Sequence, residues 1–171
     1  MPNRCLQQKT VLLAGLSLIL FGLSLMVLPP ALAADHPILY LFWGKGCPHC
    51  EKEKEFLKLL QERYPALEMR WFEVWDHPEF ADLGDALRKA YDDKITAVVP
   101  LTFCGDQALV GFISFEETGA QIEALVKGCL QKGCPDPFDK IAEQPAVKKI
   151  RAEVAQKKPQ GWAWFPAKEG F

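Results

Sequence analysis

The chain has 171 residues, with 20 Lys and Arg against 22 Asp and Glu, and its formal net charge is −2. This near-neutral balance, with no long basic block in its central part, argues against nucleic acid as a partner. The length suffices for one small domain with an additional segment at each end.

The chain begins with the pattern of an export signal. Arg4 and Lys9 precede an apolar run over residues 11–28, and small residues follow at positions 31–34. We expect cleavage after Ala33, so that residues 1–33 are a signal peptide and the protein is periplasmic or otherwise exported. The apolar run is long for a signal, and a retained membrane anchor is the alternative.

Two segments are expected after the signal, a domain over residues 34–134 and a C-terminal tail over residues 135–171. In the tail, a thin apolar stripe of Val147, Ile150 and Val154 predicts a short helix that is loosely held.

The first elements of the domain are a strand and a helix. Residues 38–43 are apolar and rich in β-forming side chains, which is typical of a buried strand. A helix is expected from Pro48 to about Tyr64, where Pro65 ends it. The charged positions 51–55 are expected to form a solvated face of this helix.

A second strand and a second helix follow. The segment from Leu67 to Trp75 alternates between polar and apolar residues and then becomes mostly apolar, which predicts a strand in a covered sheet. Trp71 and Trp75 are expected to be packing groups. The helix is expected over Pro78–Tyr91, with Asp76 as its cap.

The last elements are a hairpin and a helix. The apolar segment 95–103 is interrupted at Pro100, and a hairpin follows to residue 112. The final helix is expected to begin at Thr118, with the hydroxyl as cap, and to carry Cys129 on its inward face. The order predicts an α/β fold with a four-stranded mixed sheet and helices on both faces.

A redox dithiol is indicated at the junction of the first strand and the first helix, in the sequence Cys47-Pro48-His49-Cys50. Cys47 lies at the helix N-terminus, where unpaired N–H groups and the helix dipole stabilise a thiolate. Pro48 suits the first helical position, and His49 can add a polar or cationic influence on the sulfur. Cys47 is thus the expected nucleophile and Cys50 the resolving thiol. A zinc knuckle or an inert disulfide is the alternative.

These residues resemble the thioredoxin and glutaredoxin superfamily over about residues 38–134. The resemblance rests on Phe42 and Trp43 before the dithiol, on the dithiol itself, and on Val99-Pro100 ahead of a short hairpin. It implies a thioredoxin-like fold of the glutaredoxin type, with element order βαβαββα. It also implies a cis Pro100 packed against the active-site disulfide, a Val99 that offers its backbone to a substrate strand, and a Trp43 that supports the site.

A closer likeness is to small exported thioredoxin-like domains, and it is carried by residues 73–75, residues 110–112 and the last two cysteines. Such domains occur alongside, or fused to, a DsbD- or CcdA-like membrane electron carrier, which this likeness implies as a partner. The dipeptide between the dithiol cysteines is instead that of DsbA-type oxidants, so the direction of electron flow stays open. Thioredoxins carry a carboxylate behind the active site where this chain has Leu41.

The same likeness pairs Cys129 with Cys134. We expect a structural disulfide between them, with a second redox pair as the alternative. Cys104 ends the third strand and is expected to be a small buried hydrophobe rather than a third catalytic thiol.

The sequence thus predicts an exported thiol-disulfide oxidoreductase that needs no cofactor and holds no metal. It would act on protein thiols and disulfides or relay electrons to or from the membrane carrier. The alternative is a metal-handling module that binds copper or zinc through Cys47, Cys50 and a histidine, although the hairpin contains no histidine. A non-catalytic scaffold with a stable disulfide is a third possibility.

Overall fold

The structure is a computed structural model that describes residues 36–156 and 163–164. The signal peptide expected over residues 1–33, with its cleavage site, lies outside the described residues. Among the described residues, no helix is both long enough and apolar enough to cross a membrane.

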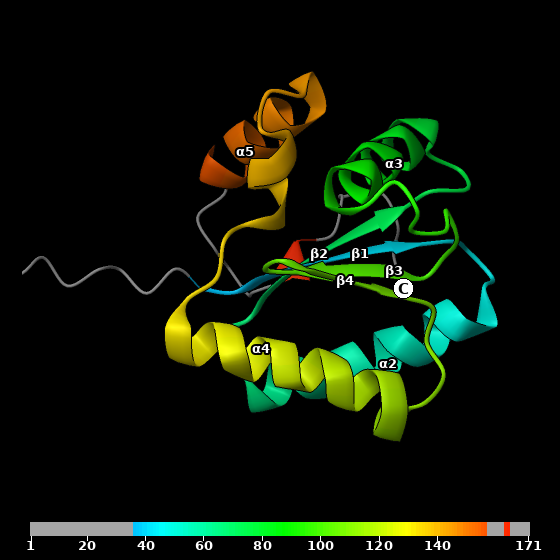
Figure 1. Ribbon diagram of the computed structural model, residues 1–171, viewed down its shortest axis with the longest axis vertical. Helices are drawn as coiled ribbons and strands as arrows, with labels where there is room; N and C mark the ends of the chain where they lie inside the picture. Colours follow the sequence, from blue (N-terminus) through cyan, green and yellow to red (C-terminus); the bar gives the residue numbers. More distant parts are fainter. Residues whose placement is uncertain (1–35, 157–162, 165–171) are drawn as a thin grey trace, which may run out of the picture. The chain divides into compact units, whose positions relative to one another are not determined.

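A mixed sheet forms the centre of the domain (Figure 1). Its strand order is β4-β3-β1-β2-β5, with β1 parallel to β2 and antiparallel to β3, and β3 antiparallel to β4. The strands are β1 (Ile38–Trp43), β2 (Glu68–Glu73), β3 (Leu101–Cys104), β4 (Gln107–Val110) and β5 (Ala163–Trp164). The predicted four-stranded mixed sheet is confirmed, and the two-residue β5 extends it by pairing parallel to β2.

Helices cover both faces of this sheet, as predicted. Figure 1 shows α2 and α4 on one face and α3 and α5 on the other. The helical elements are α2 (Pro48–Arg63), α3 (Pro78–Tyr91), the π-helix η1 (Phe115–Gly119), α4 (Ala120–Lys132), the 3-10 helix η2 (Pro137–Ile141) and α5 (Pro145–Gln156). This arrangement is a thioredoxin-like fold in which β1 and the start of α2 carry the dithiol.

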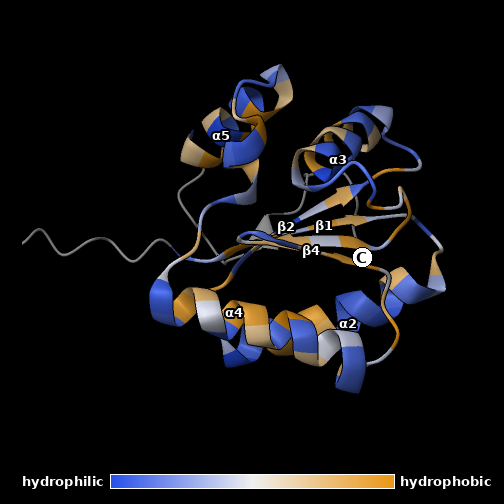
Figure 2. Ribbon diagram, viewed as in Figure 1, coloured by the Kyte–Doolittle hydropathy of each residue, from blue (hydrophilic) through white to orange (hydrophobic). Residues whose placement is uncertain are grey.

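Strand β1 supplies both cores because its side chains alternate between the two faces. Leu39 and Leu41 join the core beneath α2 and α4, whereas Tyr40 and Phe42 join the core beneath α3 and α5. Figure 2 shows β1 as a largely apolar strand and the helices with both polar and apolar residues. A strand buried on both faces reads as a continuous apolar run, which is how residues 38–43 appear in the sequence.

Strand β2 is shorter than predicted. It ends at Glu73, so Trp75 lies in the following loop and is 58% exposed, whereas Trp71 is buried. Trp71 is a packing group of the core, as expected, whereas Trp75 lies outside the core and packs against the loop that contains Gly44. Strand β3 begins only after Pro100, because a proline cannot donate to the ladder.

Two predicted helix caps are also wrong. The N-cap of α3 is His77 rather than Asp76, and it makes no side-chain capping bond. Ahead of α4, the π-helix η1 is capped by Ser114, whose hydroxyl accepts the Glu117 N–H. The Thr118 hydroxyl instead accepts the Ile113 N–H at 3.1 Å, because η1 precedes α4 and changes which donors are unpaired.

The C-terminal segment is held firmly by the domain over residues 137–156. The predicted short helix is present as α5, but it is not loosely held, because Val147 and Ile150 are buried with Phe138 in the second core. The apolar stripe of α5 is thin, and the buried residues of η2, Phe138 and Ile141, supply further apolar contact with the domain.

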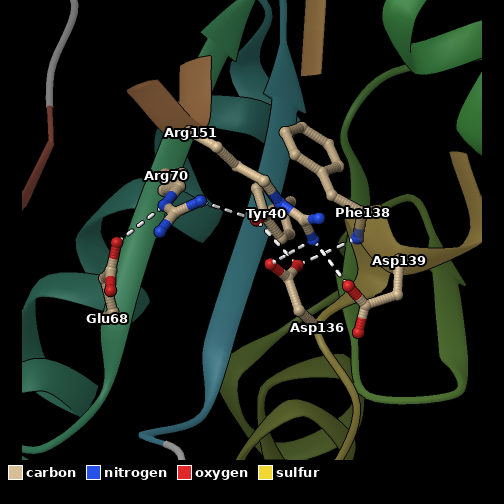
Figure 3. A network of polar contacts seen from close by, with 7 residues as sticks. All are labelled: Tyr40, Glu68, Arg70, Asp136, Phe138, Asp139 and Arg151. Atoms are coloured by element: carbon tan, nitrogen blue, oxygen red, sulfur yellow. Dashed lines mark hydrogen bonds and ion pairs between the residues drawn. The ribbon is translucent and has the colours of Figure 1, made fainter. Parts of the chain in front are cut away.

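A polar network fixes this segment to the sheet (Figure 3). The buried Tyr40 hydroxyl donates to Asp136 Oδ1 at 2.8 Å and accepts from Arg70 Nη1 at 2.8 Å. Arg70 Nε also lies 2.6 Å from Glu68, and Arg151 Nη2 lies 2.9 Å from the second oxygen of Asp136. Burial raises the pKa of Tyr40 far above its ordinary value, so its hydroxyl remains a donor, and Asp136 joins the sheet to α5.

Candidate functional site

The dithiol forms a disulfide between Cys47 and Cys50 at the start of α2, with the two Cα atoms 5.2 Å apart. Cys47 is the N-cap residue, and its sulfur accepts the Cys50 N–H at 3.3 Å. Pro48 occupies the first turn, as the sequence predicts. Cys47 is 7% exposed and Cys50 is fully buried, so an incoming group meets the Cys47 sulfur first.

His49 is exposed and contacts the segment after β4. Its Nδ1 lies 2.9 Å from the carbonyl oxygen of Phe112. A carbonyl only accepts, so Nδ1 carries the hydrogen in this contact. The expected influence of His49 on the sulfur therefore cannot come from Nδ1, which joins α2 to the residues that follow the hairpin.

Glu73, at the end of β2, holds together the two loops beside the dithiol. Its carboxylate accepts backbone N–H groups from Lys45 at 3.0 Å, Trp75 at 3.0 Å and Asp76 at 2.7 Å. Burial alone would raise the pKa of Glu73, but these three donors lower it below its ordinary value. The sequence reasoning did not assign this positioning role.

Trp75 lies directly over the loop that leads to Cys47. A Cβ added to Gly44 would lie 2.3 Å from the indole ring, so only glycine fits beneath it. Trp43 lies on the other side of the sheet, where the Lys54 ammonium is 3.8 Å from the centre of its ring. One tryptophan thus covers the loop and the other contacts helix α2.

The Val99–Pro100 peptide bond is cis, which is the geometry that the resemblance implies. The register that pairs Phe42 with Leu101 places Pro100 at the dithiol end of the sheet. A hollow of about 220 Å³ adjoins it, lined by apolar side chains that include Phe42, Trp75, Val98 and Val99. Apolar surface therefore lies beside Val99.

A buried carboxylate follows the dithiol on α2, although Leu41 occupies the position where thioredoxins carry one. Glu53 is 1% exposed, so the expectation that positions 51–55 form a solvated face is wrong for this residue. Its Oε1 accepts the Thr102 hydroxyl, and its Oε2 has no hydrogen-bond partner. Burial, which outweighs the Thr102 hydrogen bond, raises the pKa of Glu53 to about 7.

The position of Glu53 follows from helical spacing. It lies three residues after Cys50 on α2, and residues three or four apart share a helix face. The buried residues of α2 continue this spacing with Phe56, Leu57 and Leu60. The sequence did contain a signal for this burial, because Glu53 has the same helical spacing as the buried residues that begin at Cys50. The prediction of a solvated face over positions 51–55 did not use that spacing.

The other three cysteines of the described residues lie at the opposite end of the sheet from the dithiol. Cys129 and Cys134 form a disulfide, and Cys104, which is buried, faces it. Cys104 pairs in register with Leu39 at the start of β1, whereas the dithiol follows the end of β1. The four residue steps from Leu39 to Trp43 span about 13 Å, so the two disulfides are not in contact.

No group of three or more His, Cys, Asp or Glu side chains that could hold a metal ion occurs within the described ranges. No protein-family model matches the sequence, and no curated protein matches it either. The assignment rests on topology and geometry: the chain has a thioredoxin-like fold with a cysteine pair at the N-terminus of α2.

Proposed function

We propose that this protein is an exported thiol-disulfide oxidoreductase that works through Cys47 and Cys50. The observation that carries the proposal is the disulfide at the N-terminus of α2 in a thioredoxin-like fold. At that position the helix dipole and the Cys50 N–H stabilise a Cys47 thiolate. A stabilised thiolate is both a nucleophile and a good leaving group.

The exchange has two steps. When the protein is oxidised, a substrate thiolate attacks the Cys47 sulfur, the Cys47–Cys50 bond breaks, and a mixed disulfide forms between the substrate and Cys47. A second substrate thiolate then attacks the substrate sulfur of the mixed disulfide and releases Cys47. The substrate loses two electrons, and the protein gains them as two thiols. In the reverse direction Cys47 attacks a substrate disulfide and Cys50 resolves the mixed disulfide.

Glu53 supplies the proton that Cys50 needs when it leaves and accepts the proton when Cys50 attacks. With its pKa raised to about 7 by burial, both protonation states are populated near neutral pH, which suits a group that moves a proton. The oxygen Oε2 without a hydrogen-bond partner is available for this transfer.

Substrates of this site are protein thiols or disulfides, or a DsbD- or CcdA-like membrane electron carrier. Apolar residues around the site support a protein partner, since Trp75, Val98 and Ile113 are largely exposed. The N-terminal pattern over residues 1–33 supports export, and the mass of the mature protein recovered from an exporting host tests cleavage after Ala33.

Trapping tests the roles of the two cysteines. Each variant, with its remaining active-site cysteine reduced, is mixed with an unfolded protein that contains non-native disulfides, after which acid and alkylating reagent block the thiols. In the Cys50→Ser variant, Cys47 attacks a substrate disulfide and the second substrate sulfur leaves as a thiolate. Cys50→Ser should accumulate a mixed disulfide through Cys47, because nothing inside the protein resolves it. Cys47→Ser should accumulate none. Accumulation only in the Cys47→Ser variant would reverse the assignment, and accumulation in neither would refute the function.

A further inference from the structure

Three sulfur atoms lie together at the end of the sheet opposite the dithiol. Cys129, in the last turn of α4, is bonded to Cys134, which follows the helix. The sulfur of Cys104, at the end of β3, is 3.9 Å from the Cys129 sulfur. Cys104 is the cysteine that carries a free thiol in the described part of the chain. A thiol in contact with a disulfide is the arrangement from which exchange begins.

The turn between β3 and β4 closes over this cluster. Gly105 has a φ of +56°, and an added Cβ would lie 3.0 Å from Cys134 Cβ and 3.2 Å from Cys129 Sγ. The Tyr91 hydroxyl donates to the Gly105 carbonyl, which fixes the turn from the α3 side. A glycine here therefore allows the backbone to pack directly on the disulfide.

The three cysteines differ in their access to solvent. Cys104 and Cys129 are buried, whereas Cys134 is only half-buried. Among the three, Cys134 is the most accessible to another molecule.

We infer that Cys104, Cys129 and Cys134 form a second thiol-disulfide exchange centre, in which Cys104 displaces Cys134 from Cys129 and Cys134 becomes the thiol that reacts with an external disulfide. In the internal step, the Cys104 thiolate attacks the Cys129 sulfur. A Cys104–Cys129 bond forms, the Cys129–Cys134 bond breaks, and the proton lost by Cys104 passes to Cys134. The step needs no oxidant, because one disulfide replaces another.

The external step uses the released thiol. A Cys134 thiolate attacks a disulfide of another molecule, a mixed disulfide forms at Cys134, and the second sulfur of that molecule leaves as a thiolate. This centre does not need the dithiol, because the two lie near opposite ends of β1, about 13 Å apart along the strand.

The surroundings of Cys104 set the rate of the internal step. Burial raises the pKa of the Cys104 thiol to about 11, so the attacking thiolate is scarce at neutral pH. Charged and titratable groups near the turn are Tyr91, Asp106 and Lys140, and Lys140 pairs with Asp106 at 3.2 Å. The rate should therefore rise about tenfold per pH unit below the pKa of Cys104.

The C-terminal segment stays attached when Cys134 is released. Asp136, two residues later, keeps its contacts with Tyr40 and Arg151, which do not involve the disulfide. The exchange therefore requires local movement of residues 133–135 and not detachment of α5.

Iodoacetamide trapping of oxidised protein tests the inference. A Cys47→Ser/Cys50→Ser variant is incubated with the reagent at pH 7 and pH 8 without reductant, and is digested at acidic pH to prevent reshuffling. We expect alkylated Cys134 together with peptides that link Cys104 to Cys129, forming about ten times faster at pH 8 than at pH 7. The unsubstituted protein, in which Cys47 and Cys50 are bonded, should give the same product.

Cys104→Ser in the same background is the matched control and should abolish alkylation at Cys134. Alkylation of Cys104 with the Cys129–Cys134 link intact would overturn the inference. So would the absence of alkylation at all three positions, because a released Cys134 thiol cannot escape the reagent. Failure of the trapping test on Cys50→Ser would refute the proposed function and leave this result unaffected.

Discussion

The two disulfides occupy opposite ends of their helices. Cys47 caps the N-terminus of α2, where N–H groups face the sulfur, whereas Cys129 lies in the last turn of α4, with Cys134 just beyond its C-cap Gly133. The positive end of a helix dipole stabilises a thiolate and the negative end disfavours it. We therefore predict that the two pairs, although of similar spacing, differ in reactivity because each lies at a different helix end.

Their neighbours differ in the same sense. The first pair has the carboxylate Glu53 one turn further along its own helix, where burial raises its pKa to about 7. The second pair has the thiol of Cys104 in contact with it instead. The first arrangement supports the proposed exchange with a substrate, and the second supports the inferred exchange within the domain.

The largest expected effect is on activity. Cys47→Ser should reduce disulfide exchange with a protein substrate at neutral pH almost to the uncatalysed background, because no other described sulfur caps a helix N-terminus and the Cys104 thiolate that starts exchange at the second centre is scarce. Cys129→Ala/Cys134→Ala should change the rate by less than about twofold, since distant sites act independently. Measured exchange rates check both, and loss of activity in the second variant would break the comparison.

Glu53→Gln should change the pH dependence of stability. Because the pKa of Glu53 is raised to about 7 in the folded protein, the folded state holds a proton that the unfolded state loses near pH 4.5. Stability therefore falls as pH rises from about 4.5 to 7. The free energy of unfolding of the variant, relative to that of the unsubstituted protein, should therefore rise by about 3 kcal/mol between pH 4 and pH 8.

Denaturant unfolding at several pH values measures this gain. Glu55→Gln is the matched control, because Glu55 lies on the same helix and is exposed. A difference between the Glu53 variant and the unsubstituted protein that stays constant with pH would contradict the assignment.

Removing the Cys129–Cys134 disulfide should change the free energy of unfolding by less than the Glu53 substitution does. In a chain-entropy estimate for the short loop that it closes, Cys129→Ala/Cys134→Ala lowers the free energy of unfolding by about 2 kcal/mol. The measurement is denaturant unfolding under oxidising conditions. An unfolded variant would mean that this bridge, rather than the Asp136 network, anchors the C-terminal segment.

The smallest effect concerns that network. Tyr40→Phe removes the hydroxyl between Arg70 and Asp136, and since both keep other partners the cost should be about 1 kcal/mol. Tyr64→Phe removes a hydroxyl that donates to Glu123 at the surface and should cost less. Thermal unfolding compares the two, and a larger loss for Tyr64→Phe would contradict the role of the network.

Local pattern was sufficient to predict much of the fold. The apolar run before the dithiol, the helical spacing after it and the break at Pro100 indicated the order of elements that the structure has. These features depend on residues that are close together in the chain, so a single sequence is sufficient to predict them. The placement of Cys47 at the helix N-terminus is of the same kind.

The features that sequence reasoning missed depend on contacts between distant segments. Glu53 lies in a charged run, and its burial depends on the β3 residue Thr102, 49 positions away. The docking of α5 likewise depends on Asp136 and Tyr40, which are 96 positions apart. The thin apolar stripe of α5 gives no indication that a polar network also attaches this helix to the sheet.

The reduction potentials of the two disulfides test the central claim most directly. Equilibration in graded thiol and disulfide buffers, followed by acid quenching, alkylation and peptide mass spectrometry, measures each pair separately. Cys47–Cys50 should become reduced under milder conditions than the bridge that includes Cys129, because its thiolate is stabilised at a helix N-terminus. Reduction of both pairs at the same potential, or of the Cys129 bridge first, would contradict the account.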